Sequence, residues 1–355
     1  MKKLFATFVA AAIAAGSMCA CSKAPEKNGN LKIVTTIFPQ YDWVMNVLGD
    51  NPAKADVTLL QDSGADLHSF QPTASDIMKI SECDLFIYVG GESDEWVDDV
   101  LKEATNKNMV AINLMDALGD TVKEEEIVEG MQEEEHEHEH EHDHDEDHEH
   151  EHDDDHDEDH DHDEDHEHEH HHKEGEIEYD EHIWLSVKNA SVLVKTISDA
   201  LQKIDSANAN TYKLNADSYI AKLADLDKQY QDVVNNASVK TVLFGDRFPF
   251  RYLVDDYGLT YYAAFVGCSA ESEASFETIT FLAKKTDELS LHAVLTIEGK
   301  THKIAETIID NTASKDQKIL TMDSMQSVTS ADIANGANYI SIMESNLSVL
   351  KEALS

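Results

Sequence analysis

Basic residues are scarce in this chain: 27 lysines and arginines face 72 aspartates and glutamates over 355 residues, and the net charge is −45. This shortage argues against nucleic acid and anionic lipid as partners, because both attract positively charged surfaces. An acidic surface is instead compatible with cations. The length is sufficient for two ordinary domains, each with a core of its own.

Cysteine is also rare, with four residues in the whole chain. Two of them, Cys19 and Cys21, lie near the N-terminus, which leaves Cys83 and Cys268 for the body of the protein. We expect these two to lie in different domains. A disulfide between them in an oxidising compartment is one interpretation, and two buried thiols are the other.

The apolar run near the N-terminus, Leu4 to Ala15, is too short to span a membrane as a mature helix. Two lysines precede it and small residues follow it, as in an export signal. A bacterial lipoprotein signal is cleaved before a cysteine, and Cys21 fits better than Cys19 because Ala20 precedes it. A plain secretory signal is the alternative. We therefore expect residues 1–20 to be removed and Cys21 to anchor an exported protein to the outer face of the cell membrane, in a periplasm or at the cell surface.

Histidine is concentrated in one run. All forty residues from Glu133 to His172 are His, Asp or Glu, and they include 16 of the 20 histidines. Nothing in this run can bury apolar area, so we expect a disordered insertion. Its many weak imidazole sites indicate an accessory collector or sensor of metal ions, and a solvated acidic spacer is the alternative. The rest of the chain keeps 48 acidic and 27 basic residues, a net charge of −21.

Strands and helices alternate on both sides of this run, which predicts an α/β fold with two open lobes and mostly parallel sheets. The predicted strands are LKIVTTIFP, ADVTLLQ, DLFIYVGG and MVAINLM in the first lobe, and VKTVLFG, LTYYAAF, LHAVLTIEG and KILTM in the second. We place the first lobe at residues 31–205, after a linker at 21–30, and the second at 237–355.

One predicted helix, at residues 206–236, is uncommonly long and regular. Its apolar positions recur in alternating steps of four and three residues from Tyr212 to Val233. At 1.5 Å per residue, about 28 residues would reach roughly 40 Å, long enough to brace the two lobes. A last helix is predicted from Asp332 to Leu354. Two lobes joined in this way form a cleft, and open parallel sheets bind ligands beyond the carboxyl ends of their strands.

Four histidines lie outside the acidic run. His68, in GADLHSFQPTASD, lies in a loop between a predicted strand and a helix, where a site residue of an open sheet is expected. His182, in YDEHIWLSVKNA, lies just ahead of a helix, and acidic neighbours there can orient its imidazole. His292 lies at the start of a strand, far from the expected cleft, and we interpret it as structural. His302 follows a later strand.

The segments GADLHSFQPTASDIMKI and DEHIWLSVKNA resemble, in that order, the two histidine-bearing motifs of the zinc and manganese receptors of bacterial ABC importers, the ZnuA-like family. TTIFPQYDWVMNVLGD, CDLFIYVGG, the long helix and YLVDDYGLTYYAAF are similar to that family in order and spacing. The similarity covers roughly Leu31 to Leu354 apart from the run, and a histidine-rich acidic loop at this point is typical of the zinc-handling members. The resemblance implies a metal ion in the cleft, with His68 and His182 as ligands.

The resemblance also implies a third ligand, a histidine or glutamate, just after TVLFG, where this chain has Arg247. A guanidinium does not bind metal ions, so Asp246 and His302 are the alternatives. A fourth ligand, a carboxylate in a segment similar to LTMDSM, points to Asp323, with Glu298 as a further ligand or an outer partner. Imidazole and carboxylate suit four-coordinate Zn²⁺, whereas Mn²⁺ prefers more oxygen, and the sequence leaves both metals open.

These observations predict a monomeric, lipid-anchored solute-binding protein that captures Zn²⁺, or Mn²⁺, and delivers it to the permease of an ABC importer. A surface metal-sequestering protein or adhesin is a second interpretation, and a zinc hydrolase is a third. His68 and His182 are not spaced as in H-E-x-x-H, and the sequence has no G-x-S-x-G motif. We therefore expect no enzymatic activity and no catalytic residues.

Overall fold

The computed structural model describes residues 30–50, 53–64, 66–132, 178–269, 273–299 and 301–355. From Leu31 on, these residues form one compact unit. The expected export signal, Cys21 and the acidic histidine-rich run lie outside the described residues.

The first four strands form a parallel sheet in the order β2-β1-β3-β4. The strands are β1 Lys32–Thr35, β2 Asp56–Leu59, β3 Leu85–Tyr88 and β4 Val110–Asn113. Successive residues of a strand face opposite sides of the sheet. Accordingly, Ile33 and Leu85 belong to the core under α1 (Phe38–Leu48) and α5 (Val187–Ile204). Val34 and Phe86 belong to the core under α2 (Ala74–Glu82) and α3 (Trp96–Glu103).

The second sheet is also parallel, in the order β6-β5-β7-β8. Its strands are β5 Thr241–Phe248, β6 Thr260–Val266, β7 Ala293–Ile297 and β8 Lys318–Met322. Leu243 and Val294 pack under α8 (Phe276–Glu288) and α9 (Lys303–Asp310). The alternate residues Phe244 and Leu295 pack under α7 (Arg251–Tyr257) and α11 (Tyr339–Ala353). Helices therefore cover both faces of both sheets, and the expected two-lobed α/β fold is confirmed.

The helices alternate with the strands along the chain. They are α1 Phe38–Leu48, α2 Ala74–Glu82, α3 Trp96–Glu103, α4 Leu114–Leu118, α5 Val187–Ile204, α6 Ala209–Asn236, α7 Arg251–Tyr257, α8 Phe276–Glu288, α9 Lys303–Asp310, α10 Ser330–Ala334 and α11 Tyr339–Ala353. In the described part of the chain, none of them combines the length and the apolar character that crossing a membrane requires.

The bounds of two helices differ from those that we expected. Helix α1 begins at Phe38, inside the segment LKIVTTIFP that we expected to be a strand, because Pro39 fits the first helical turn, where its missing N–H leaves no hydrogen bond unmade. The expectation of one C-terminal helix from Asp332 to Leu354 was wrong. Gly336, at φ 101°, breaks it into α10 and α11, since this left-handed conformation is readily adopted only by glycine.

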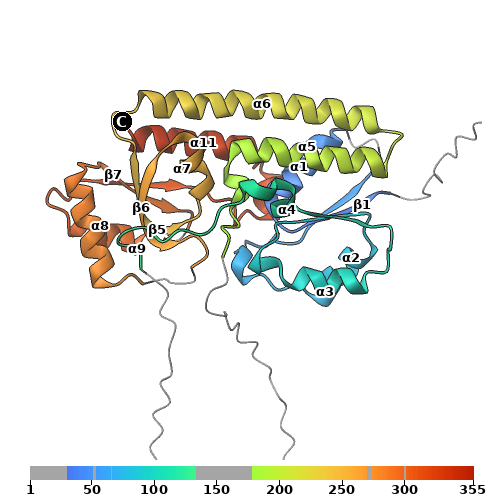
Figure 1. The fold of residues 1–355 in the computed structure, drawn as a ribbon, viewed down its shortest axis with the longest axis horizontal. Coiled ribbons are helices and arrows are strands. Elements are labelled where there is room, and N and C mark those ends of the chain that lie inside the picture. The colour runs from blue at the N-terminus through green and yellow to red at the C-terminus, as the bar shows by residue number, and fades with distance from the viewer. Residues whose placement is uncertain (1–29, 51–52, 65, 133–177, 270–272, 300) are drawn as a thin grey trace, which may run out of the picture. The chain divides into compact units, whose positions relative to one another are not determined.

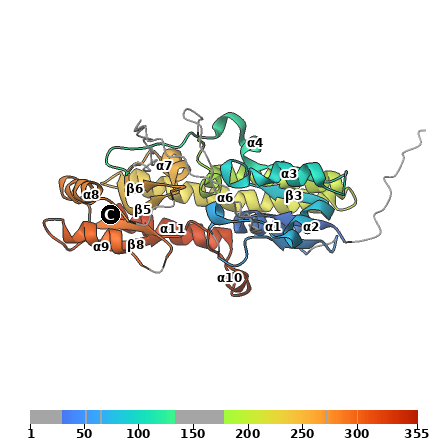
Figure 2. The same cartoon turned by 90° about the horizontal axis from the view of Figure 1, so that it is seen from below.

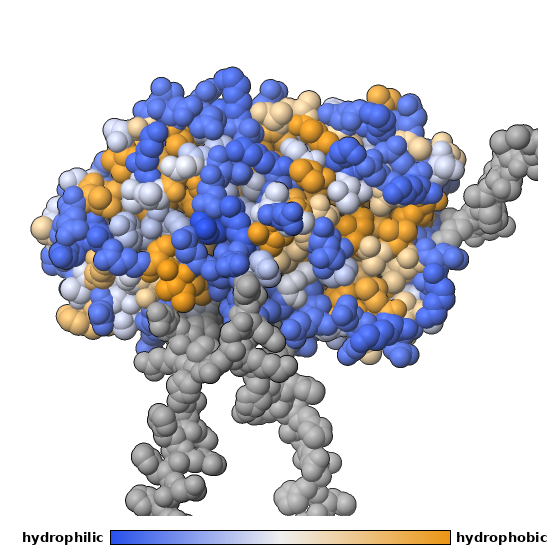
Figure 3. Space-filling model, in the orientation of Figure 1, coloured by the Kyte–Doolittle hydropathy of each residue, from blue (hydrophilic) through white to orange (hydrophobic). Residues whose placement is uncertain are grey.

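Helix α6 runs past both sheets (Figures 1 and 2) and braces them. Its buried residues are Tyr212, Ala216, Tyr219, Leu223, Leu226, Tyr230 and Val234. The hydroxyl of Tyr219 donates to Asp42 Oδ2 of α1 at 3.0 Å, and that of Tyr230 donates to the Met343 carbonyl of α11 at 2.7 Å. The opposite face of α6 is mainly polar, although Leu214 is exposed on it, and hydrophilic residues predominate along the upper edge of the surface in Figure 3. One helix thus ties elements of both lobes together.

Candidate metal centre

His68 is placed by a short 3-10 helix, Leu67–Ser69, beyond the carboxyl end of β2. Asp66 precedes this turn, and its Oδ1 accepts a hydrogen bond from the backbone N–H of His68 at 3.1 Å. Leu67 is buried and anchors the turn in the core. The imidazole of His68 is therefore presented from a fixed loop at the edge of the first sheet.

His182 is placed in a similar way, directly before the 3-10 helix Ile183–Leu185. Its backbone N–H donates to Asp180 Oδ1 at 2.8 Å, and the next three residues are buried. Ser186 then caps the N-terminus of α5. His182 is itself fully buried.

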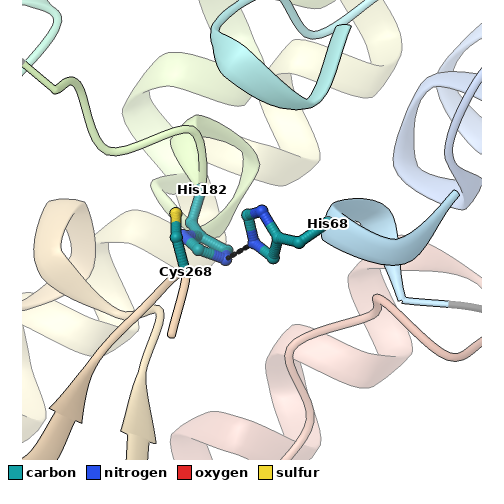
Figure 4. Close-up of side chains that lie close together, drawn as sticks. All are labelled: His68, His182 and Cys268. Carbon is teal, nitrogen blue, oxygen red and sulfur yellow. Dashed lines mark hydrogen bonds between the residues drawn. The ribbon is translucent and has the colours of Figure 1, made fainter. Parts of the chain in front are cut away.

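The two imidazoles face each other, with 3.4 Å between their Nε2 atoms (Figure 4). Nδ1 of His182 lies 2.9 Å from Asp180 Oδ1, and Nδ1 of His68 lies 2.9 Å from Ser93 Oγ. A carboxylate only accepts, so Nδ1 of His182 carries the proton and its Nε2 keeps a lone pair. Two nitrogens bound tetrahedrally to zinc at about 2.05 Å would be about 3.3 Å apart. The observed separation fits a cation held by both Nε2 atoms.

Cys268 brings a thiol to the same point from the second lobe. It lies two residues after β6, and its Sγ lies within 4.8 Å of one ring nitrogen of His68 and one of His182. In the described part of the chain, this is the one group of three such residues that meet so closely. Gly267 permits the approach, because a Cβ there would lie 2.9 Å from Cε1 of His182. Tetrahedral zinc requires sulfur–nitrogen separations of about 3.6 Å, which falls within the 4.8 Å that encloses the three ligand atoms.

Buried groups around the site set its charge. Glu181 accepts a hydrogen bond from the Ser93 N–H at 2.8 Å through Oε1, while its Oε2 lies 3.6 Å from Nδ1 of His68. Burial raises the pKa of Glu181 to about 7. Burial, followed by the charge of His182, lowers the pKa of His68 to about 3. His68 is therefore neutral at physiological pH and offers its lone pair to a cation.

The Cys268 thiol is protonated before any cation binds. Its pKa is raised well above the ordinary value, first by burial and then by the negative charges of Glu125 and Asp180. A bound cation reverses this preference, because a coordinated thiol is deprotonated. Metal binding here therefore releases a proton.

Asp246 and His302 lie together elsewhere in the second lobe. They line a cavity of about 540 Å³ with Glu273. Neighbouring residues of a strand point to opposite sides. The Asp246 side chain accordingly accepts from the Ile297 N–H at 3.3 Å, whereas Arg247 turns toward the first lobe and donates to Asp66 Oδ2 at 2.6 Å. Neither Asp246 nor His302 belongs to the group formed with His68 and His182.

Asp323 is also outside that group and lies instead beside Glu298. Asp323 Oδ1 accepts from the Met325 N–H at 2.7 Å, and Glu298 accepts from the N–H and hydroxyl of Ser324. Burial raises the pKa of both carboxyls, and the charge of Asp323 raises that of Glu298 further. His292 contacts the carbonyl of Ser355, at the other end of the second sheet.

Cys268 is the member of this group of three that the sequence alone did not indicate as a metal ligand. Its one usable signal was its position just beyond a strand, the same signal that identified His68.

Cys83 lies in the first lobe with its Sγ 3.4 Å from the Met109 sulfur, and Cys83 and Cys268 form no disulfide with each other. The expectation of thiols rather than a disulfide is the one that the structure supports.

The sequence of this chain is similar to those of known proteins. The family profile described as ZnuA, zinc-uptake complex component A, periplasmic, matches residues 33–353. The zinc-binding lipoprotein AdcA of Streptococcus pneumoniae is 31% identical over 354 residues, which cover 99% of this chain and 61% of AdcA. The high-affinity zinc uptake system protein ZnuA of Bacillus subtilis is 30% identical over 358 residues, covering 99% of this chain and 98% of that protein.

A solved structure shares the fold. The crystal structure of the Zn(II)-bound ZnuA-like domain of Streptococcus pneumoniae AdcA superposes with a TM-score of 0.65 at 27% identity, over 92% of this chain and 99% of that domain. The chain thus corresponds to the ZnuA-like part of AdcA and spans about 61% of the full length of that relative.

Proposed function

Because this chain belongs to the ZnuA family of periplasmic zinc-uptake components, we propose that it is an extracytoplasmic receptor that captures Zn²⁺ and delivers it to an ABC-type importer. The observation that carries the proposal is the convergence of His68, His182 and Cys268 within 4.8 Å, with ligands from both lobes. A cation held between lobes is accessible when they separate, which suits capture and delivery.

We assign the three ligands to His68 Nε2, His182 Nε2 and Cys268 Sγ, in place of Asp246, His302 and Asp323. Zinc readily accepts two imidazoles and one thiolate, with a water molecule in the fourth position. Manganese prefers carboxylate, carbonyl and water oxygens, and a soft thiolate disfavours it. The donor set therefore favours Zn²⁺ over Mn²⁺.

Membrane attachment and the partner follow from the same proposal. AdcA of Streptococcus pneumoniae is named a lipoprotein, and this chain has Cys21 after a short apolar run. We propose that Cys21 is lipidated and anchors the receptor, as a monomer, to the outer face of the cell membrane, beside the permease. Replacing Cys21 with alanine should release the exported protein from the membrane fraction, and retention of that variant in the membrane would refute the assignment.

We propose that the run Glu133–His172 is an accessory collector that raises the local supply of metal. The test is calorimetric titration of Zn²⁺ and Mn²⁺ into three proteins: the chain from Cys21 onward, the same chain without residues 133–172, and the His68→Ala/His182→Ala double variant. One tight zinc site should survive the deletion, several weaker ones should disappear with it, and the double variant should lose the tight site. If tight binding disappears with the run, the protein is a surface metal-sequestering protein on an α/β scaffold.

A further inference from the structure

Arginine is used only twice in this chain, at Arg247 and Arg251, among 27 basic residues. Arginine differs from lysine in its planar fork, which can donate to two acceptors at once in a fixed geometry. The guanidinium of Arg247 donates hydrogen bonds to both lobes. Nη2 donates to Asp66 Oδ2 at 2.6 Å, and Nη1 donates to the Ser269 carbonyl at 3.3 Å.

Both acceptors are connected directly to metal ligands. Asp66 belongs to the first lobe, and its other oxygen accepts from the His68 N–H at 3.1 Å. Ser269 belongs to the second lobe and follows Cys268 in the chain. One guanidinium thereby joins the backbone of a ligand from one lobe to the backbone of a ligand from the other. We call this arrangement of Arg247, Asp66 and Ser269 the Arg247 bridge.

The bridge is partly protected from water, since the side chains of Arg247 and Asp66 are 20% and 25% exposed. Hydrogen bonds between a guanidinium and a carboxylate are among the stronger ones in proteins. Although burial favours the neutral acid, the charge and hydrogen bond of Arg247 lower the pKa of Asp66 below its ordinary value.

We propose that Arg247 is a positioning residue that sets the separation between His68 and Cys268 and so determines how tightly and how long zinc is held. This inference rests on the proposed function. Arg247 does not bind the metal; it holds two ligands from opposite lobes at the distance that the metal requires. Separation of the lobes must break the bridge, so the bridge also slows the release of zinc.

The test compares Arg247→Lys, Asp66→Asn and the double variant with the unchanged protein. Lysine keeps the charge but presents no fork, so it cannot hold both acceptors in the same geometry. The matched control is Arg251→Lys. Arg251 is 19% exposed and pairs with Glu126 and Asp255, and none of these three residues belongs to the group formed by His68, His182 and Cys268.

Zinc affinity and dissociation rate are measured by competition with a chromophoric chelator, and Co²⁺ is used as a spectroscopic probe of the thiolate. Loss of outer partners of metal ligands typically weakens binding by about 10- to 100-fold. We expect such a loss in Arg247→Lys and in Asp66→Asn, with faster dissociation and a weaker thiolate-to-cobalt absorption band. The double variant should lose no more than the more affected single variant, because both changes break one bridge.

Thermal unfolding of the metal-free variants separates positioning from folding. Arg247→Lys and Arg251→Lys should unfold at similar temperatures, while only the first loses zinc affinity. Zinc binding and a cobalt spectrum like those of the unchanged protein in both Arg247→Lys and Asp66→Asn would overturn the inference. Failure of the proposed function would show differently, as the absence of a tight zinc site in the unchanged protein.

Discussion

Asp180 and His182 form a buried pair in which Oδ1 of the carboxylate lies 2.9 Å from Nδ1 of the imidazole. The carboxylate fixes the proton on Nδ1 and leaves the lone pair of Nε2 facing His68. The orientation of a proposed zinc ligand thus depends on a residue only two positions earlier in the chain.

Asp180→Asn should weaken zinc binding by about 10- to 100-fold without changing the shape of the side chain. An amide can donate to Nδ1, and this stabilises the tautomer in which Nε2 carries the proton and has no lone pair for the metal. Chelator competition measures the loss. Asp199→Asn, an exposed change of the same charge on α5, serves as the control, and equal affinities of the two variants would contradict this role of Asp180.

Cys268→Ala should reduce the number of protons released on zinc binding by about one at pH 7.5. The pKa of the Cys268 thiol is raised well above its ordinary value by burial, so the thiol is protonated until the metal displaces its proton. Calorimetry in two buffers with different ionisation enthalpies measures the release. The affinity should also fall by about tenfold or more, because one of three protein ligands is gone. Equal proton release in both proteins would exclude Cys268 as a ligand.

A plot of the zinc affinity against pH should change slope near pH 7. Burial raises the pKa of Glu181 to about 7, so below that pH the bound cation must displace its proton, and above it the carboxylate is already ionised. Affinity should therefore fall more steeply below pH 7 than above it, by up to about a further tenfold per pH unit. His68, with a pKa of about 3, stays neutral from pH 6 to 8 and adds no such bend.

Glu181→Gln isolates this effect. The variant should titrate with a constant slope across pH 6 to 8, because the thiol of Cys268 loses its proton to zinc over the whole range. A bend of the same size in Glu181→Gln and in the unchanged protein would assign the titration to another group.

Tyr230→Phe should lower the free energy of unfolding by about 1–3 kcal/mol. The hydroxyl of Tyr230 is fully buried and donates to the Met343 carbonyl at 2.7 Å, so its removal breaks a contact between α6 and α11. Urea unfolding of the metal-free protein gives the difference. Tyr179, which is 45% exposed, provides the control change Tyr179→Phe, and a similar small effect of both would argue against α6 as the brace.

Most of the fold could be predicted because its signals are local. Apolar strands alternating with amphipathic helices predict parallel sheets, and the spacing from Tyr212 predicts the buried face of α6. That face ends on Val234 rather than Val233, since the period of a helix is 3.6 residues and not a fixed alternation of four and three. The break at Gly336 was missed because a single glycine inside an apolar pattern is compatible with a continuous helix.

The site was less predictable because it depends on how the lobes meet. His68 and His182 lie in loops with recognisable neighbours, whereas Cys268 stands alone after a strand and carries no local pattern. Its approach to the histidines is set by distant contacts, such as the hydrogen bonds from Trp184 Nε1 to the Ser324 carbonyl and from the Tyr339 hydroxyl to the Trp184 carbonyl. Contacts across such sequence separations are not encoded in any one segment.

An anomalous difference map at the zinc absorption edge would locate the bound ion, using crystals of the chain without residues 133–172 grown with one equivalent of Zn²⁺. We predict one dominant peak between Nε2 of His68, Nε2 of His182 and Sγ of Cys268. A dominant peak beside Asp246 and His302, or beside Asp323 and Glu298, with nothing between the two imidazoles, would contradict it.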